Sequence, residues 1–387
     1  MPDGRDQPVL RLGNGIAKIQ AAAWDACAGD TNPSLSHAFL AAMEESGSVG
    51  KGSGWRPQPL MLESSDGILL GAAPLYIKSH SYGEYVFDHG WANAYEQAGG
   101  RYYPKLLVGV PFTPVPGPRL LVRPGAEAEA NRRLLAEGLV AATRQLGVSS
   151  LHVNFADDTD GRTLTDVGLM ERVATQYHWQ NGGYKTFADF LAGLASRKRK
   201  MIRKEREAAL RNGLVVKRLT GSQITRDHWR AFFQFYIDTS ERKWGSPYLT
   251  RDFFLRIGEA MADRILLVMA EQEGEPVACA LNLIGRDALY GRNWGSDGAY
   301  RFLHFEACYY QAIEFAIERG LARVEAGAQG EHKIGRGYLP VETRSFHHIV
   351  DRNFAAAVAD FLRREKAAVE AEREALAGYS PFRRTNG

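Results

Sequence analysis

Cysteine is scarce in this sequence, and long apolar runs are missing. The 387 residues include only three cysteines, Cys27, Cys279 and Cys308, which are far apart and form no Cys-x-x-Cys pair. Their number and spacing argue against a disulfide framework or a cysteine-based zinc cluster and are typical of a reducing compartment. No stretch reaches the ~18 uninterrupted apolar residues of a membrane-spanning helix, and residues 1–6 are polar, unlike a signal peptide. We therefore expect a cytoplasmic protein without a membrane span.

Net charge is also small. The chain has 48 basic and 45 acidic residues, a balance of +3, so its overall charge does not favour a nucleic-acid binder and we expect no DNA partner. Hydrophobic residues make up 45% and charged residues 24%, as in ordinary globular proteins. A chain of this length is expected to form two domains, each long enough to bury its own core.

One pattern of elements occurs twice, about 205 residues apart. Each copy has two apolar strands joined by a turn that contains glycine, a third strand, a helix that ends at a glycine, and a further strand. The first copy has strands at 59–63, 68–77, 85–91 and 149–155 and a helix at 131–146; the second has strands at 265–271, 276–284, 288–294 and 322–326 and a helix at 302–319. The sequence therefore predicts a duplicated α/β fold, with a mixed sheet flanked by helices in each copy.

A strongly basic helix is expected between the two copies. Residues 186–189 form the pattern of a capping box, and Asn-Gly at 212–213 supplies a stop. Residues 196–206 contain seven cations, several of which, such as Lys200 and Arg203, recur at helical spacing and repel one another. Two explanations stay open: a solvated helix face, or a site for a phosphate-bearing partner such as a coenzyme, tRNA or an anionic lipid.

This helix divides the chain into its expected parts. We expect a first domain over residues 1–183, a basic linker helix over 184–213 and a second domain over 214–387. Further helices are expected at 226–242, 251–262 and 353–376.

The most unusual loop follows the last strand of the second copy. Residues 325–339 contain four glycines, which alternate with Glu331, His332, Lys333 and Arg336. Glycine lets the backbone approach a ligand closely, and a loop needed only for folding would favour neutral turn formers over an acid, an imidazole and two cations. We interpret it as an active-site loop; the alternative is a solvated glycine-rich turn.

Four stretches carry a resemblance to a known family. They are Pro-Phe-Thr-Pro-Val-Pro-Gly at 111–117, Ser-Arg-Lys-Arg-Lys at 196–200, His-Phe-Glu-Ala-Cys-Tyr-Tyr-Gln at 304–311, and Glu-Ala-Gly-Ala-Gln-Gly-Glu-His-Lys at 325–333. Together with the duplication, they resemble the FemAB-like family of predicted N-acyltransferases, a divergent branch of the double GNAT fold, over residues 36–348. The resemblance implies tandem GNAT-like domains that transfer an acyl or aminoacyl group to an amine, with no metal and no tightly bound cofactor.

The donor stays open between an acyl-CoA and an aminoacyl-tRNA. Acetyltransferases of the wider fold hold the coenzyme pyrophosphate with a glycine-rich pattern that opens a helix. The equivalent residues here, Asn-Trp-Gly-Ser-Asp-Gly-Ala at 293–299, contain glycines but lack that pattern. We expect Asn293 to contact the donor there, and Lys200 and Arg203 to bind its phosphates.

Acyl transfer to an amine requires a base, a stabilised oxyanion and a bound donor. His332 is the expected base, because an unperturbed imidazole titrates near pH ~6.5. Glu331 is the alternative base, with His332 then orienting it. Arg336 or the backbone N–H groups of residues 327–330 would stabilise the oxyanion.

The start of the predicted helix at 302–319 supplies two further catalytic candidates, His304 and Glu306. They lie two residues apart and therefore on different faces. Glu306 also has a purely structural explanation, because an acid in the first turn interacts favourably with the helix dipole. Tyr309 and Tyr310 complete an apolar stripe and are expected to pack.

The remaining candidates bind substrate. Gln329 and Lys333 of the glycine loop are expected to contact the donor or acceptor. In the first copy, four prolines stiffen residues 111–118, so Thr113 and Trp91 could shape an acceptor pocket at the interface of the copies. A simple structural linker is the alternative.

The sequence thus predicts an N-acyltransferase that acts on an amine of a small molecule or peptide. The alternative within this class is a Fem-type ligase that takes its donor from aminoacyl-tRNA and acts on a peptidoglycan precursor or peptide. The rival is a non-catalytic anion-binding protein of the same fold. Histidines 347–348 lie on a strand, where alternation separates their rings, and no metal-ligand spacing occurs, so we expect no metal. The donor, the acceptor and the oligomeric state are not specified by the sequence.

Overall fold

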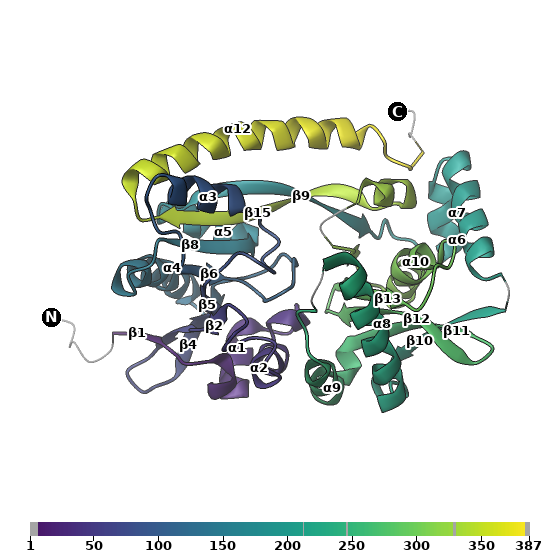
Figure 1. Cartoon of the computed structure of the whole chain (residues 1–387), viewed down its shortest axis with the longest axis horizontal. Coiled ribbons are helices and arrows are strands. Elements are labelled where there is room, and N and C mark those ends of the chain that lie inside the picture. Colours follow the sequence, from purple (N-terminus) through teal and green to yellow (C-terminus); the bar gives the residue numbers. More distant parts are fainter. Residues whose placement is uncertain (1–6, 212, 245–246, 328–329, 384–387) are drawn as a thin grey trace. The chain divides into compact units, whose positions relative to one another are not determined.

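A computed structural model describes residues 7–211, 213–244, 247–327 and 330–383 (Figure 1). The chain forms two compact units that exchange segments: unit 1 contains residues 1–174 and 342–370, and unit 2 contains residues 175–341 and 371–387. The exchange occurs within strand β9 (Met170–Gln180), strand β15 (Leu339–Ile349) and helix α12 (Arg352–Ala377). The expected bounds followed the chain from end to end and did not include this exchange.

Unit 1 is built on two groups of strands. A four-stranded sheet has the order β1 (Val9–Leu12), β3 (Leu60–Glu63), β4 (Leu69–Ala73), β7 (Leu121–Val122). The second group has the order β15, β8 (Ser150–Ala156), β6 (Lys105–Val108), β5 (Leu75–Lys78), β2 (Trp55–Pro57). Strands β6 and β8 are parallel, with Leu106 opposite Leu151, and every residue of β8 is buried, as is usual for a parallel strand covered on both faces.

Helices cover both groups of strands in unit 1. They are α1 (Ala21–Ala28), α2 (His37–Glu45), α3 (His89–Gln97), α4 (Ala128–Gln145) and α5 (Asp158–Asp166). Helix α4 connects the parallel strands β6 and β8, and its residues Leu135 and Leu139 pack in one core with Leu60 and Val153. The helix and the strand predicted at 131–146 and 149–155 are confirmed within a few residues.

The strand predicted at residues 85–91 is wrong. These residues form a loop and the first turn of α3, and β6 takes the position of the third strand. The carboxylates of Glu84 and Asp88 both accept hydrogen bonds from the buried Lys105 Nζ, at 2.8 and 2.5 Å. These ion pairs hold the loop against β6, so it does not extend as a strand.

Unit 2 repeats the plan of unit 1. Its strands β10 (Leu214–Thr220), β11 (Ile265–Gln272), β12 (Glu275–Ile284) and β13 (Ala288–Ser296) form an antiparallel meander. Strand β14 (Arg323–Glu325) is parallel to β13 and antiparallel to β9. Between β13 and β14 the chain forms α10 (Leu303–Phe305), a π-helix (Glu306–Tyr310) and α11 (Gln311–Glu318). A helical connection between two parallel strands therefore occurs in both units, which confirms the predicted duplication.

The predicted basic helix is in fact two helices. Helix α6 (Phe187–Gly193) begins with the capping box expected at 186–189, but it ends at Gly193, and α7 (Ser196–Ala209) follows. Between them, Leu194 has an extended backbone and forms a β-bridge with Phe382 of the C-terminal segment. That segment takes backbone groups which a continuous helix would use for itself, and this explains the break.

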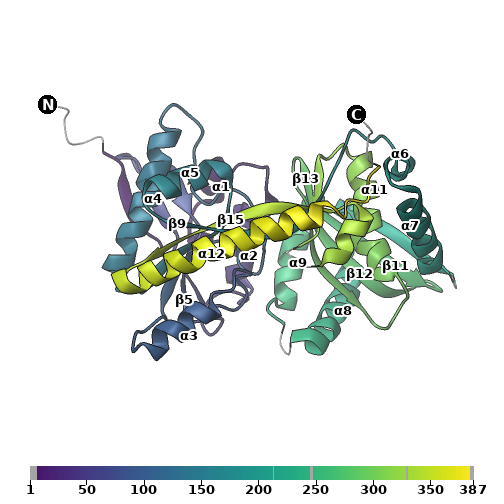
Figure 2. The ribbon, with the colours of Figure 1, turned by 90° about the horizontal axis from the view of Figure 1, so that it is seen from above.

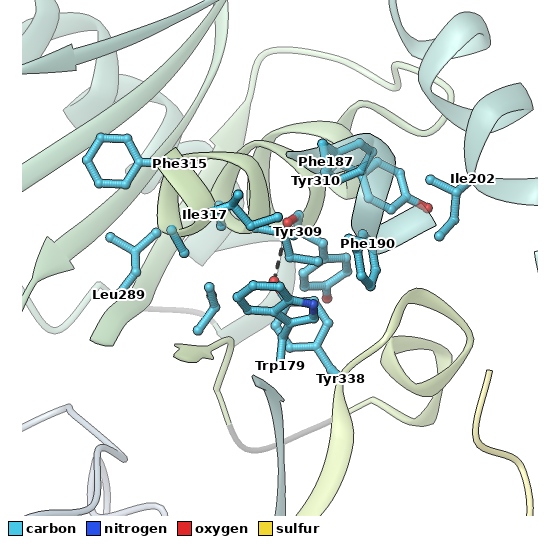
Figure 3. Packing of buried hydrophobic residues seen from close by; sticks show 14 of the residues in the cluster. Trp179, Phe187, Phe190, Ile202, Leu289, Tyr309, Tyr310, Phe315, Ile317 and Tyr338 are labelled. Carbon is cyan, nitrogen blue, oxygen red and sulfur yellow. Dashed lines mark hydrogen bonds between the residues drawn. The ribbon is translucent and has the colours of Figure 1, made fainter. Parts of the chain in front are cut away.

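Several aromatic rings pack together in the core of unit 2 (Figure 3). Trp179 of β9 meets Phe190 of α6 edge-on, with ring centroids 5.9 Å apart. Tyr338 packs on Tyr309 at 5.3 Å and donates its hydroxyl to the Tyr309 carbonyl oxygen at 3.3 Å. These contacts fix the π-helix against β9 and the start of β15, and thereby fix the direction of the Tyr309 side chain.

Helix α12 follows β15 and appears as one continuous helix in Figure 2. Its residues Val358 and Leu362 pack with Trp91 and Ile349 in unit 1. The helix predicted at 353–376 is therefore confirmed. No helix in the described part of the chain combines the length and the apolar character that crossing a membrane requires.

Helix α8 (Arg226–Trp244) packs closely on strand β13 at Gly295. A Cβ at Gly295 would lie 2.2 Å from the carbonyl oxygen of Phe235 in α8, whereas at Gly291 of the same strand the nearest atom would be 3.4 Å away. We expect Gly295→Ala to destabilise the fold by ~1–3 kcal/mol because backbone must shift, and Gly291→Ala to cost under ~1 kcal/mol. Urea unfolding followed by circular dichroism measures both, and equal midpoints would contradict this packing.

Candidate active site

Two parallel strands diverge in unit 2. The ladder between β13 and β14 covers only three residue pairs, from Ala288–Arg323 to Tyr290–Glu325. Beyond Tyr290, β13 continues along β12 to Ser296, whereas the chain after β14 leaves the sheet. From Glu331 to Arg336 it forms a 3-10 helix, which we call the His332 turn. The loop predicted as an active site therefore begins where the two strands separate.

His332 is exposed on this turn, and its imidazole is hydrogen-bonded to a tyrosine. The distance between His332 Nε2 and Tyr309 Oη is 3.1 Å, and the ring lies 5.6 Å from that of Phe305. Partial burial, and then the charges of Arg336 and Lys333, lower the pKa of His332. The ring is therefore neutral near pH 7 and can take up a proton.

The π-helix directs Tyr309 toward this ring. A π-helical turn changes the angle between successive side chains, and such turns are frequent at functional sites. Here the Tyr309 hydroxyl reaches His332, and burial raises the Tyr309 pKa, so the hydroxyl keeps its proton. His304 lies edge-on to Tyr309 at 5.3 Å and to Trp294 at 5.4 Å. The structure thus brings His304 and His332 to the same tyrosine.

Lys333 and Arg336, predicted to contact ligands, are both buried. Lys333 Nζ donates to the carbonyl oxygens of Ala326 and Gly327 at 2.7 and 3.0 Å, and burial lowers its pKa to about 8. Arg336 forms a two-pronged ion pair with Glu205 of α7 at 2.7 and 3.1 Å. Both cations therefore shape the backbone of the loop.

Glu306 is fully buried. Its carboxylate accepts from Arg206 of α7 at 2.9–3.2 Å and from Gln311 at 2.7 Å. Arg206 also pairs with Glu314 at 2.8 Å. A carboxylate in this position connects α7 to the helical segment that carries Tyr309, and has no open side toward a substrate in this arrangement.

The other predicted residues of unit 2 are divided between the turn and the strands. Glu331 is exposed at the first position of the His332 turn. Asn293 lies on β13 beyond the point where β14 ends, and its buried Oδ1 has no hydrogen-bond partner within the described part of the chain. Gln329 lies outside the described residues.

Helix α7 has one buried and one cationic face. Ile202, Glu205 and Ala209 are buried against unit 2. The exposed cations are Arg197, Lys200, Arg203 and Lys204. Across the described ranges none of these four takes part in an ion pair, so the predicted donor-binding residues Lys200 and Arg203 remain available to an anion.

The predicted acceptor-pocket residues belong to unit 1, where both are buried. Trp91 packs edge-on against His347 at 4.9 Å, and the Thr113 hydroxyl donates to the Pro111 carbonyl oxygen at 2.8 Å. His347 is buried beside His152, with 2.7 Å between their Nδ1 atoms. Among the residues that the structure describes, no three His, Cys, Asp or Glu side chains are arranged to hold a metal ion.

Sequence reasoning missed two residues of this arrangement. Tyr309 was expected to pack, because its spacing fits an apolar stripe of an ordinary helix, and the π-helix that redirects it has no clear signature in the sequence. Glu205 was hidden among the cations of α7. A lone acid near the end of a basic run was a usable signal, since a buried partner cation is one reason to place it there.

Comparisons with known proteins agree with this architecture. A family model described as peptidoglycan biosynthesis/recognition matches residues 15–384. Among solved structures, FemX is similar with a TM-score of 0.55 and 11% identity, covering 88% of this chain and 98% of FemX. L-PGS from Bacillus licheniformis has a TM-score of 0.50 and 13% identity, and the match covers 87% of this chain and 97% of L-PGS. The C-terminal domain of a putative lysylphosphatidylglycerol synthetase from Agrobacterium fabrum has a TM-score of 0.51 and 11% identity. That match covers 88% of this chain and 94% of the domain.

At these identities the likeness shows the fold alone. No curated protein matches the sequence. The predicted mixed α/β class is confirmed, and so is the family suggested by the motifs.

Removing one partner of the ion pair between Arg206 and Glu306 is predicted to destabilise unit 2 strongly. Arg206→Met leaves the fully buried Glu306 carboxylate without its counter-ion, which costs ~3–5 kcal/mol. The matched control is Arg211→Met, which removes an exposed pair with Glu207 and costs under ~1 kcal/mol. Guanidinium unfolding curves give both values, and similar losses in the two variants would contradict the assignment.

Proposed function

The chain belongs to the FemAB-like family, and we propose that it is an N-acyltransferase that moves an acyl or aminoacyl group onto an amine acceptor. The observation that carries the proposal is the hydrogen bond between His332 Nε2 and Tyr309 Oη at the end of the diverging strands. An exposed imidazole with a lowered pKa, held by a tyrosine that keeps its own proton, suits proton transfer near neutral pH.

The proposed reaction needs a single base, His332, which takes up one proton and later returns it. The acceptor ammonium first releases one proton to solvent. As the amine nitrogen attacks the carbonyl carbon of the donor, a C–N bond forms and His332 takes the second proton, directly or through the Tyr309 hydroxyl. Collapse of the oxyanion then breaks the C–S bond of a thioester or the C–O bond of an aminoacyl ester, and the imidazolium returns its proton to the leaving sulfur or oxygen.

The donor is proposed to bind along β13 and α7. Asn293 Oδ1, which has no partner among the described residues, can accept a hydrogen bond from an N–H group of the donor, and pairing it would remove the free-energy cost of an unsatisfied buried acceptor. Lys200 and Arg203, with the neighbouring exposed cations of α7, would bind donor phosphates. Acyl-CoA and aminoacyl-tRNA both carry the required phosphates.

The cationic face of α7 also favours a more specific version of the proposal. Four exposed cations within eight residues suit a polyanion better than a single pyrophosphate. With the family description in view, this version is an aminoacyl-tRNA-dependent ligase whose acceptor is a peptidoglycan precursor or a peptide.

His332→Gln tests the base. We expect acyl transfer to fall ~10²–10⁴-fold with little change in stability, because the ring is exposed and serves as proton acceptor. The wild-type rate should decrease as the pH falls through a pKa below 6.5, since the base is active only when neutral and its pKa is lowered. The assay measures thiol release from acyl-CoA and deacylation of aminoacyl-tRNA in the presence of amines. His228→Gln, which replaces a half-buried histidine on α8, is the control. Equal rates in the two variants would contradict the assignment of His332.

Replacing Lys200, Arg203 and Lys204 together by serine tests the donor site. Loss of up to three phosphate contacts should reduce the steepness with which the logarithm of the donor-binding constant falls with the logarithm of the salt concentration. The expected reduction in slope is about 2 for a single-stranded donor, because each contact contributes ~0.7. Fluorescence anisotropy with labelled aminoacyl-tRNA and with a labelled acyl-CoA gives the slope for each donor. The control replaces the exposed Arg226, Arg230 and Arg251 of α8 and α9 (Arg251–Ala260) by serine. An unchanged slope in the α7 variant, or an equal change in the control, would remove α7 from the donor site.

A further inference from the structure

Glu205 occupies an unusual place on the basic helix. It is the acid within the cationic run 196–206, it is 6% exposed, and it lies on the face of α7 opposite the exposed cations. A buried carboxylate on a short basic helix is costly unless its hydrogen bonds are satisfied. The partners of Glu205 therefore indicate what it does.

The partners of Glu205 connect it to both the backbone and the side chain of His332. Glu205 accepts two hydrogen bonds from the Arg336 guanidinium and one from the Tyr310 hydroxyl. The third nitrogen of that guanidinium, Arg336 Nη1, donates to the His332 carbonyl oxygen at 2.6 Å. Tyr309, the neighbour of Tyr310 in the π-helix, contacts the His332 imidazole. The backbone and the side chain of His332 are thus held by one closed network.

Resting on the proposed function, we propose that Glu205 is a positioning residue for His332, acting through Arg336 and Tyr310. Without the carboxylate, the guanidinium loses two of its hydrogen-bonding partners and the Tyr310 hydroxyl loses its acceptor. Arg336 also lies over the Phe305 ring at 3.5 Å, so it would keep a position near the site but not its orientation. The His332 turn would then sample several positions relative to Tyr309.

A comparison with Arg206 distinguishes the positioning of His332 from the simple attachment of α7 to the helical segment. Arg206, the next residue, also joins α7 to the helical segment, through Glu306 and Glu314, but none of these three side chains is bonded to the His332 turn in the described residues. Glu314→Gln weakens the attachment of α7 while leaving the Glu205 network in place. It is therefore the matched control.

Hydrogen–deuterium exchange of the full chain tests positioning without any substrate. The amides of Lys333, Gly337 and Tyr338 are protected by hydrogen bonds to Gly330, Ile334 and Lys333, respectively. We expect Glu205→Ala to speed their exchange at least tenfold, Glu205→Gln less, because its amide oxygen still accepts a hydrogen bond, and Glu314→Gln less than twofold. Tyr310→Phe is the milder variant should Glu205→Ala not fold, and it should give a smaller increase. Unchanged exchange in Glu205→Gln and Tyr310→Phe would overturn the proposal.

Kinetics supply the readout that a purely structural role would not change. With acetyl-CoA or aminoacyl-tRNA, whichever the wild-type chain uses, Glu205→Gln should lower kcat at least tenfold while the donor KM stays within twofold, and Glu314→Gln should change neither. A raised KM with an unchanged kcat would overturn the positioning role. If His332→Gln kept full activity, the assignment of His332 as the base would fail, and if the wild-type chain transferred from neither donor, the proposed function would fail; in both cases the exchange data would still show whether Glu205 orders the turn.

Discussion

The arrangement of unit 2 depends on a buried carboxylate–guanidinium pair between Glu205 and Arg336. It joins the basic helix α7 to the turn that carries His332, and a second pair, Arg206 with Glu306, joins the same helix to the π-helix that carries Tyr309. Buried pairs of this kind contribute little when compared with apolar packing, but removing one partner is costly. They therefore specify which elements are adjacent rather than supply most of the stability.

The same pairs divide the charges of the site into two groups. Lys333 and Arg336 were predicted to bind ligand, yet both are bonded to carbonyl or carboxylate oxygens of the protein itself, as is Arg206. Among the predicted site residues that the structure describes, the His332 imidazole, the exposed Glu331 and the exposed cations of α7 remain open to a ligand, as does Asn293 Oδ1. A site of this composition can move a proton at His332 while a phosphate-bearing molecule is bound some residues away, which is what a transfer reaction with a large donor requires.

The fold was largely predictable because its signals are local and repeated. Two apolar strands around a glycine turn, followed by a helix that ends at Gly147 or Gly320, occur in both halves of the sequence. Failures occurred where distant partners decide the structure. Residues 85–91 are apolar enough for a strand, but Lys105 holds Glu84 and Asp88 in a loop. Helix 187–211 breaks because Leu194 pairs with Phe382, almost two hundred residues later.

The position of the candidate site in the sequence was predictable, but the hydrogen bonds and ion pairs between its residues were not. The glycine-rich stretch with His332 was visible, because imidazole and charges in such a loop have few structural reasons to occur. Tyr309 and Glu205 were not, since helical spacing made one look like packing and the surrounding cations concealed the other. Which buried charges pair with each other depends on contacts between residues 100 or more positions apart, such as Glu205 with Arg336 and Arg206 with Glu306.

The most direct test of the account is the NMR signal of the His332 ring in protein with labelled histidine, assigned with His332→Gln and followed while acyl-CoA or aminoacyl-tRNA is added. If chemistry occurs at this turn, one of the two donors will shift the His332 resonance in a saturable way, and the resonance of His228 on α8 will not move. If a donor binds and changes other resonances while His332 stays unaffected, the reaction centre lies elsewhere in the chain.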